Sequence, residues 1–460
     1  MNTATTPRRG MPLLPKLILV LAGLLLLLVL AVAVWRVMMV PGNARRLAAI
    51  KATGEPATVR ELDVWYEAVD AKENAALRWI EAMDECVPPI TTGLQAPWSE
   101  IKMPPRGRKL SVADLQAAAE ILEDNKESLA LFRQAAALPK SRYPVDLSQG
   151  VFADLPHLSL LKSAVNLLQL EALHHGQNGR GAEAAASIHA MIGAGRSLAQ
   201  EPLLISQLVR AALDYLAGSA TERVLNLTPL TEPQLAALQA AFAAAETPNL
   251  STRALVGERA CTATVLHAPE QLTPPSNPQA LQNSIATQQG FGSALMRGSG
   301  FFQRDLGFFL DAMATNIAAS RLADPDLFHS RTNTDAIAGR ARRGYYIMSG
   351  LTLPALARTT DRDVSHRARL RTVQTALAIE RYRLASGGRL PATLEALVPK
   401  YLAAPPVDPF NGEPLRFKPR TPGYVVYSVG EDGTDDDGTP RPSGSRPKET
   451  PHDIPFVVEK

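Results

Sequence analysis

The sequence predicts a mainly α-helical protein with an N-terminal transmembrane helix, a helical exported domain and a small C-terminal α+β domain. Three observations support this fold class. One long run near the N-terminus is apolar, alanine and leucine fill most apolar positions of the long middle region, and the last hundred or so residues contain short strand-like runs between prolines and glycines. Alanine and leucine lose little on entering a helix, whereas short apolar runs bounded by turn residues are typical of strands.

The apolar run extends from Leu17 to Trp35 without a charged residue. A helix of this length can cross about 30 Å of hydrocarbon. We therefore expect a transmembrane anchor at 17–40, preceded by a cytoplasmic N-terminus at 1–16. A cleaved secretory signal is the alternative, because Ala31-Val32-Ala33 has an A-x-A pattern, but the run stays apolar beyond it.

The middle region, 58–356, is predicted to be one mainly helical domain. Three capping boxes predict helix starts, because each pairs a hydroxyl side chain with an acidic or amide side chain three residues later. A Gln-, Asn-, Ser- and Gly-rich stretch between about 273 and 300 predicts a long loop or lid. The capping pairs are Thr58 with Glu61, Ser111 with Asp114, and Thr231 with Gln234.

Two apolar helical patterns flank a glycine-rich turn at 176–181. This helical hairpin resembles a tetratricopeptide unit, but a tetratricopeptide array repeats about every 34 residues and only one such hairpin is evident. We therefore favour helix packing without a repeat.

The C-terminal region, 362–460, is predicted to be a separate α+β domain. A helical pattern ends at Gly387-Gly388, and two strand-like runs, 415–418 and 424–429, are expected to pair as a hairpin. The segment 453–458 could add a third strand. The basic residues of "ARLR" and "ERYR" lie on the helix, and such a face is usually solvated or paired with acids.

Charge and cysteine content exclude some classes of function. The chain has 48 basic and 45 acidic residues, so no overall field attracts nucleic acid, and no nucleic-acid partner is expected. Cys86 and Cys261 match no metal or redox spacing and are interpreted as buried thiols, with a single disulfide as the alternative. No linear motif of a zinc protease, a serine hydrolase or a nucleotide-binding loop is present.

The order of motifs in the last hundred or so residues resembles the C-terminal head of the major pseudopilin of bacterial type II secretion. The motifs are "ERYRLASGGRLP", "DPFNG" and "GYVVYSVGEDGTDDDG", and the match covers about residues 365–460. The whole chain also resembles a group of large membrane-anchored bacterial proteins with the same ending, and that group brings no assigned activity. The resemblance implies a pseudopilin-like α+β head and a place in the bacterial envelope.

The resemblance also implies a calcium ion in the loop "GEDGTDDDG", residues 430–438, which we call the acidic loop. Asp432 matches the family's calcium aspartate, Asp435 and Asp437 lie in the same loop, and Asp453 matches the acidic position near the chain end. Carboxylates on a flexible glycine-containing loop are also the ligands that Ca²⁺ takes, although a solvated acidic turn explains the same residues.

The N-terminal end departs from the pseudopilin pattern. Pro15 stands where a prepilin has a glutamate, and about three hundred residues separate the anchor from the head, so the chain is not expected to be a pilin. We expect a single-pass protein of the bacterial inner membrane with most of the chain outside the cytoplasm. A non-enzymatic binding or scaffold role is predicted, with envelope or secretion proteins as partners. The alternative is an enzyme whose site lies in the helical domain.

Overall fold

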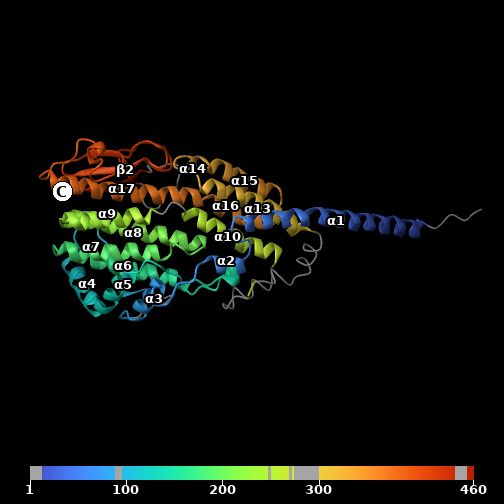
Figure 1. Cartoon of the computed structure of the whole chain (residues 1–460), viewed down its shortest axis with the longest axis horizontal. Helices are drawn as coiled ribbons and strands as arrows, with labels where there is room; N and C mark the ends of the chain where they lie inside the picture. Colours follow the sequence, from blue (N-terminus) through green and yellow to red (C-terminus); the bar gives the residue numbers. More distant parts are fainter. Residues whose placement is uncertain (1–12, 89–95, 247–249, 269–271, 274–299, 441–452) are drawn as a thin grey trace, which may run out of the picture.

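The computed structural model describes residues 13–88, 96–246, 250–268, 272–273, 300–440 and 453–460. The helices lie side by side in layers along the long axis of the molecule (Figure 1). Helix α17 and a small sheet form one side, helices α3 to α5 form the other, and α1 projects from the end. The expectations for 1–12 and for most of the loop at 273–300 concern residues outside the described part.

Regular elements are predominantly helical. The N-terminal half contains α1 (Leu13–Ala52), α2 (Val59–Trp65), α3 (Ala75–Asp84), η1 (Pro97–Ser99), α4 (Val112–Asp124), α5 (Lys126–Ala137), η2 (Leu147–Phe152), α6 (Pro156–Gln177), α7 (Gly181–Ser197) and α8 (Leu204–Leu227). The C-terminal half contains α9 (Glu232–Ala245), α10 (Leu250–His267), α13 (Phe301–Ser320), α14 (Asp326–His329), α15 (Arg331–Arg343), α16 (Ile347–Ala357), α17 (Thr359–Ala385) and η4 (Leu394–Leu397). The strands are β1 (Arg416–Pro419), β2 (Tyr424–Ser428) and β3 (Ile454–Val458).

The predicted capping pairs begin helices in the structure. The hydroxyl of Ser111 accepts a hydrogen bond from the backbone N–H of Asp114, at 3.1 Å, at the start of α4. Thr231 and Gln234 form a complete capping box at the start of α9. These contacts satisfy backbone donors that the first helical turn leaves without partners. The three predicted helix starts are therefore confirmed, since Thr58 also caps α2.

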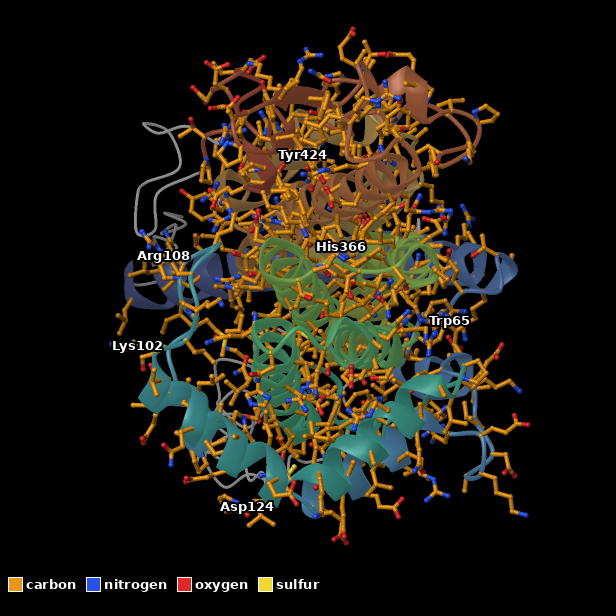
Figure 2. All side chains as sticks on the ribbon, turned by 90° about the vertical axis from the view of Figure 1, so that its left-hand side faces the viewer. Trp65, Lys102, Arg108, Asp124, His366 and Tyr424 are labelled. Carbon is orange, nitrogen blue, oxygen red and sulfur yellow. The ribbon has the colours of Figure 1, made fainter. Side chains whose placement is uncertain are left out.

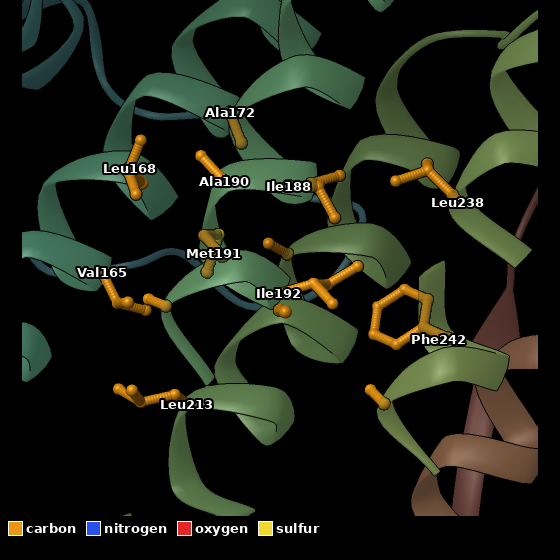
Figure 3. Close-up of a cluster of buried hydrophobic side chains, with 14 of the residues drawn as sticks. Val165, Leu168, Ala172, Ile188, Ala190, Met191, Ile192, Leu213, Leu238 and Phe242 are labelled. Atoms are coloured by element: carbon orange, nitrogen blue, oxygen red, sulfur yellow. The ribbon is translucent and has the colours of Figure 1, made fainter. Parts of the chain in front are cut away.

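Helices α6 to α9 enclose the main apolar core (Figure 3). Five side chains of this core have no exposed surface: Leu168 of α6, Ile188 and Met191 of α7, Leu213 of α8 and Phe242 of α9. Small residues on α7 allow neighbouring helices to approach closely, since a Cβ added at Gly193 would lie 2.4 Å from the Cβ of Ala136. The hairpin predicted around 176–181 is therefore part of a continuous helical stack.

Helix α17 belongs to two layers. It packs on α8 and α9 on one side and on β2 and β3 on the other. Its residues Leu370, Val373 and Leu377 share one buried cluster with both the helices and the strands. The predicted boundary between 356 and 362 coincides with the junction of α16 and α17, but the apolar core continues across it. The limits 58–356 and 362–460 stay a prediction.

The C-terminal sheet is antiparallel in the order β1-β2-β3. Val426 of β2 pairs with Phe417 of β1 and with Phe456 of β3. The hairpin and the third strand predicted from the sequence are confirmed. All five residues of β2 are buried, because α17 covers one face and the acidic loop covers the other.

The N-terminal helix corrects two predictions. Among the described residues, no helix combines the length and apolar character that crossing a membrane requires. The expected transmembrane anchor at 17–40, and with it the single-pass location in the bacterial inner membrane, is wrong by this finding. Helix α1 does not end at residue 40 but continues to Ala52, and its polar C-terminal part packs on α13 through a bidentate contact of Arg46 with Asp311, at 2.7 and 2.8 Å.

Candidate functional site: a polar cleft beside helix α17

One face of α17 presents arginines to a cleft. Arg358 immediately precedes the helix, and Arg362, Ser365 and Arg369 follow at intervals of four, three and four residues. This spacing places all four side chains on the same helix face. They line a cleft of about 860 Å³ whose floor includes apolar residues of α8. The floor residues are Leu208, Ala211 and Ala212.

The three arginines of this face are exposed and have no ion-pair partner among the residues that the structure describes. In the part of the chain that the structure describes, no carboxylate oxygen lies within 4 Å of the guanidinium of Arg358, Arg362 or Arg369. The guanidinium carbon of Arg369 lies 4.8 Å from the ring centroid of Tyr215, which is 51% exposed. A cation over an aromatic face keeps most of its capacity to bind an anion, because the ring offers only a weak attraction. We call Arg358, Arg362 and Arg369 the arginine face.

Acidic side chains line the same cleft. Asp335 of α15, Asp361 of α17 and Glu431 of the acidic loop contribute to its wall. Arg331 lies 3.8 Å from Asp361 and 3.6 Å from Glu431, so one cation serves two carboxylates. Burial, together with the nearby charge of Glu431, raises the pKa of Asp361 to about 6. The cleft therefore carries charges of both signs.

A buried histidine–aspartate pair marks the inner end of the cleft. Nε2 of His366 lies 2.9 Å from Oδ2 of Asp214, and both side chains are at most 5% exposed. Figure 2 shows His366 near the middle of the molecule, between the layer of α17 and the helices below it. Oδ1 of Asp214 faces Gly195 of α7 and has no hydrogen-bond partner in the described part of the chain. The aspartate thus fixes the imidazole from inside the helix stack.

A smaller cavity of about 330 Å³ continues inward from this pair. It shares Tyr215, Ser365, His366, Arg369 and Glu431 with the outer cleft. The wall beyond them contains Arg106 and Glu222, whose side chains pair at 3.2 Å, and burial raises the pKa of Glu222. Helical and C-terminal residues therefore enclose the site together.

A buried network of charges holds α17 in this position. Asp363 accepts from Arg367 at 3.1 Å, and Asp324 lies 3.4 Å from Arg367 and 2.7 Å from Arg371. Arg371 also pairs with Glu246 at 2.7 Å. Charges in a poorly solvated interior are stable only when they are paired in this way. The network fixes the opposite face of α17, so the arginine face keeps a constant orientation toward the cleft.

The structure does not gather the predicted metal ligands into one site. Asp435 accepts from the hydroxyl of Tyr427 at 2.8 Å and lies 3.7 Å from Nζ of Lys418. Asp437 pairs with the same Lys418, while Asp432 caps the backbone N–H of Thr434 at 3.1 Å. No group of three or more His, Cys, Asp or Glu side chains among the described residues could hold a metal ion.

Asp453 differs from Asp432, Asp435 and Asp437 because it is buried. Its Oδ2 accepts from the backbone N–H groups of Asp436 and Gly438, at 3.1 and 2.7 Å, whereas its buried Oδ1 has no hydrogen-bond partner among the described residues. The residue is 3% exposed. Burial and the neighbouring Asp436 and Asp435 raise its pKa to about 6. Asp453 therefore fits a cation, but Asp435 and Asp437 fit only if they leave Lys418.

A second, apolar groove of about 360 Å³ lies on the other side of the helix stack. It is lined mainly by small residues of α5, α7 and α9, with two arginines and a histidine at its rim. Burial and the nearby Arg196 lower the pKa of His189, and Arg133 at the rim is held by both oxygens of Glu171. The alanines in the wall are Ala136, Ala137, Ala186, Ala190, Ala241, Ala244 and Ala245.

The cysteines do not form a reactive site. Cys86 and Cys261 are both free and buried, which confirms their interpretation as buried thiols. Burial raises the pKa of Cys86 to about 11 and that of Cys261 further, so neither supplies a thiolate at neutral pH.

In the described residues no hydroxyl or thiol is hydrogen-bonded to the imidazole of His366, which pairs only with Asp214.

Comparison with known proteins gives no family model, no curated protein and no solved structure that matches the chain. The site is therefore defined by its own geometry. Sequence reasoning placed Arg369 on a basic helix face that is usually solvated or paired, but it did not identify the arginine face, although the spacing of Arg358, Arg362 and Arg369 is visible in the sequence. It did not identify the His366–Asp214 pair, because the two residues are far apart along the chain and no local motif joins them.

Proposed function

We propose that this chain is a non-enzymatic binding protein whose ligand occupies the cleft beside α17. The observation that carries this proposal is the arginine face: three exposed guanidinium groups line a cleft without a carboxylate partner among the described residues. The other charged side chains of α17 are mostly paired, as Arg367, Arg371 and Arg381 show. Unpaired charge in a concave polar site is typical of ligand recognition.

A binding role is favoured over catalysis by the state of the reactive groups. His366 is enclosed and pairs with Asp214, and the described residues offer it no nucleophile to activate. Nucleophilic catalysis requires a nucleophile within hydrogen-bond reach of its base. The expected link to envelope or secretion proteins stays a prediction.

The proposal is tested by hydrogen exchange on the full chain. Pools of short peptides, mononucleotides and small carboxylic acids are added, and amide protection is measured at 358–369 and around Tyr215. We expect one pool to slow exchange at both places and the bound compound to be recovered chemically unchanged. Absence of protection with every pool would overturn the binding site. A product that forms with the natural chain but not with His366→Asn would overturn the non-enzymatic role.

A further inference from the structure

We infer that the ligand of the cleft is an extended peptide segment that carries both acidic and basic side chains. This inference rests on the proposed binding function and names its ligand class. Three features of the cleft lead to it: the length of the arginine face, the apolar floor, and the carboxylates that line the same cleft.

The arginine face has the length of a short peptide. Eleven helical positions separate Arg358 from Arg369, which is about 16 Å at 1.5 Å per residue. An extended chain of about five residues spans this distance at roughly 3.3 Å per residue. Guanidinium groups bind carboxylates through paired, charge-assisted hydrogen bonds. A ligand with acidic side chains spaced along an extended backbone therefore matches the face.

The carboxylates of the cleft exclude a simple polyanion. Asp335, Asp361 and Glu431 line the same cleft as the arginines. Among the basic side chains of the described part, only Arg331 forms an ion pair with Asp361 or Glu431. A nucleic acid backbone carries a negative charge at every position, so it would approach these carboxylates as well as the arginines. Bringing like charges together at an interface costs binding free energy, which disfavours a uniformly negative ligand. A chain with lysine as well as glutamate or aspartate satisfies both groups.

The floor of the cleft fits a polypeptide better than a small polar metabolite. Leu208, Ala211 and Ala212 of α8 give an apolar surface between the charged groups, and Tyr215 adds an exposed ring at its edge. The methylene groups of lysine and glutamate side chains cover such surfaces while their charged ends reach the walls. Peptide recognition of this kind needs shape and charge on one extended surface.

Fluorescence anisotropy on the full chain tests the inference. Four labelled probes are compared: a six-residue peptide of alternating glutamate and lysine, hexaglutamate, hexalysine, and a single-stranded oligonucleotide of similar charge to hexaglutamate. We expect the alternating peptide to bind most tightly. Arg362→Gln should weaken its binding about tenfold, because a charge-assisted contact is lost. Arg60→Gln, at an exposed arginine outside the cleft, is the matched control and should change binding less than twofold.

The variant Asp335→Asn provides an independent readout. Loss of this carboxylate should weaken the alternating peptide and strengthen hexaglutamate, because one attraction and one repulsion disappear together. Equal binding of hexaglutamate and the alternating peptide, unchanged by Asp335→Asn, would overturn the mixed-charge inference. Tighter binding of the oligonucleotide, with amide protection at 358–369, would also overturn it while leaving the cleft as the binding site. No protection by any probe would overturn both proposals.

Discussion

The acidic loop and the arginine face of α17 both concentrate charge of one sign, but they differ in how that charge is satisfied. Lys418 contacts Asp435 and Asp437. Backbone N–H groups donate hydrogen bonds to Asp432 and to one oxygen of Asp453. The three guanidinium groups of the arginine face have no such partners among the described residues. A high local charge therefore does not by itself indicate a binding site, whereas charge left unpaired in a cleft does.

The largest effect is expected where the inner end of the cleft meets the helix stack. A Cβ at Gly195 would lie 2.5 Å from Oδ1 of Asp214, which is buried and holds His366. Gly195→Ala should therefore displace Asp214 and lower the free energy of unfolding by about 1–3 kcal/mol, the range for overpacking a core. Urea unfolding measures this change.

The matched control for Gly195 is another buried helical glycine. A Cβ at Gly176 would meet Val224 at an ordinary 3.4 Å, so Gly176→Ala should keep or increase stability by up to about 1 kcal/mol through helix propensity. If Gly195→Ala proves as stable as Gly176→Ala, then Asp214 is not held tightly. Its side chain would then move aside for the added methyl group at little cost in free energy.

Calcium provides the next largest effect and tests the acidic loop directly. If Asp432, Asp435, Asp437 and Asp453 bind Ca²⁺, the folded state gains about 2.7 kcal/mol when free calcium is a hundredfold above the dissociation constant. Thermal unfolding of the full chain with calcium and with chelator measures the gain. Asp432→Ala should remove most of it, whereas Glu395→Ala, at an exposed acid outside the loop, should not. An unchanged melting temperature at millimolar calcium would make the loop a solvated turn.

A third test compares Asp453 of the loop region with Asp361 of the cleft. Both have a pKa raised to about 6, against roughly 3.9 in an unfolded chain. Between these values the folded state binds more protons than the unfolded state, so each group lowers stability as pH rises from about 4 to about 6. Asp453→Asn and Asp361→Asn should each reduce this loss.

Melting temperatures of the natural chain and the two variants at pH 4, 5, 6 and 7 measure the difference. The advantage of each variant over the natural chain should grow with pH and level off above about 7. A difference that is constant with pH would show that the carboxylate keeps an ordinary pKa. Bound calcium would abolish the effect at Asp453 but not at Asp361, which separates the two regions.

The smallest effect is expected from the cation that neutralises the loop. Lys418 is exposed, so Lys418→Ala should change the free energy of unfolding by less than about 1 kcal/mol, as is usual for surface ion pairs. The same variant frees Asp435 and Asp437 and should increase the stabilisation by calcium. Equal calcium responses in the variant and the natural chain would show that Lys418 does not compete with a metal ion.

Local signals predicted local structure well. The hydroxyl residues Thr58, Ser111 and Thr231 begin helices because a cap acts within one helical turn, and Gly387 follows the end of α17 for the same reason. The cleft depended on contacts between distant segments. Arg369 and Arg371 look equivalent in the sequence, yet only Arg371 meets Glu246 and Asp324, because two positions along a helix rotate the side chain by about 200°. Similarly, nothing near Asp435 in sequence indicates that Lys418 occupies its carboxylate.

The position of α17 between two layers also affects how the chain folds during synthesis. Helices α8 and α9 are complete at residue 245, but α17, which covers them, ends only at Ala385. At about 5–20 residues per second, the covering helix follows many seconds later. Nascent chains arrested after α9 should therefore bind chaperones and be cut by protease faster than chains arrested after the C-terminal sheet. Equal protease resistance of the two arrested chains would show that α6 to α9 fold stably without α17.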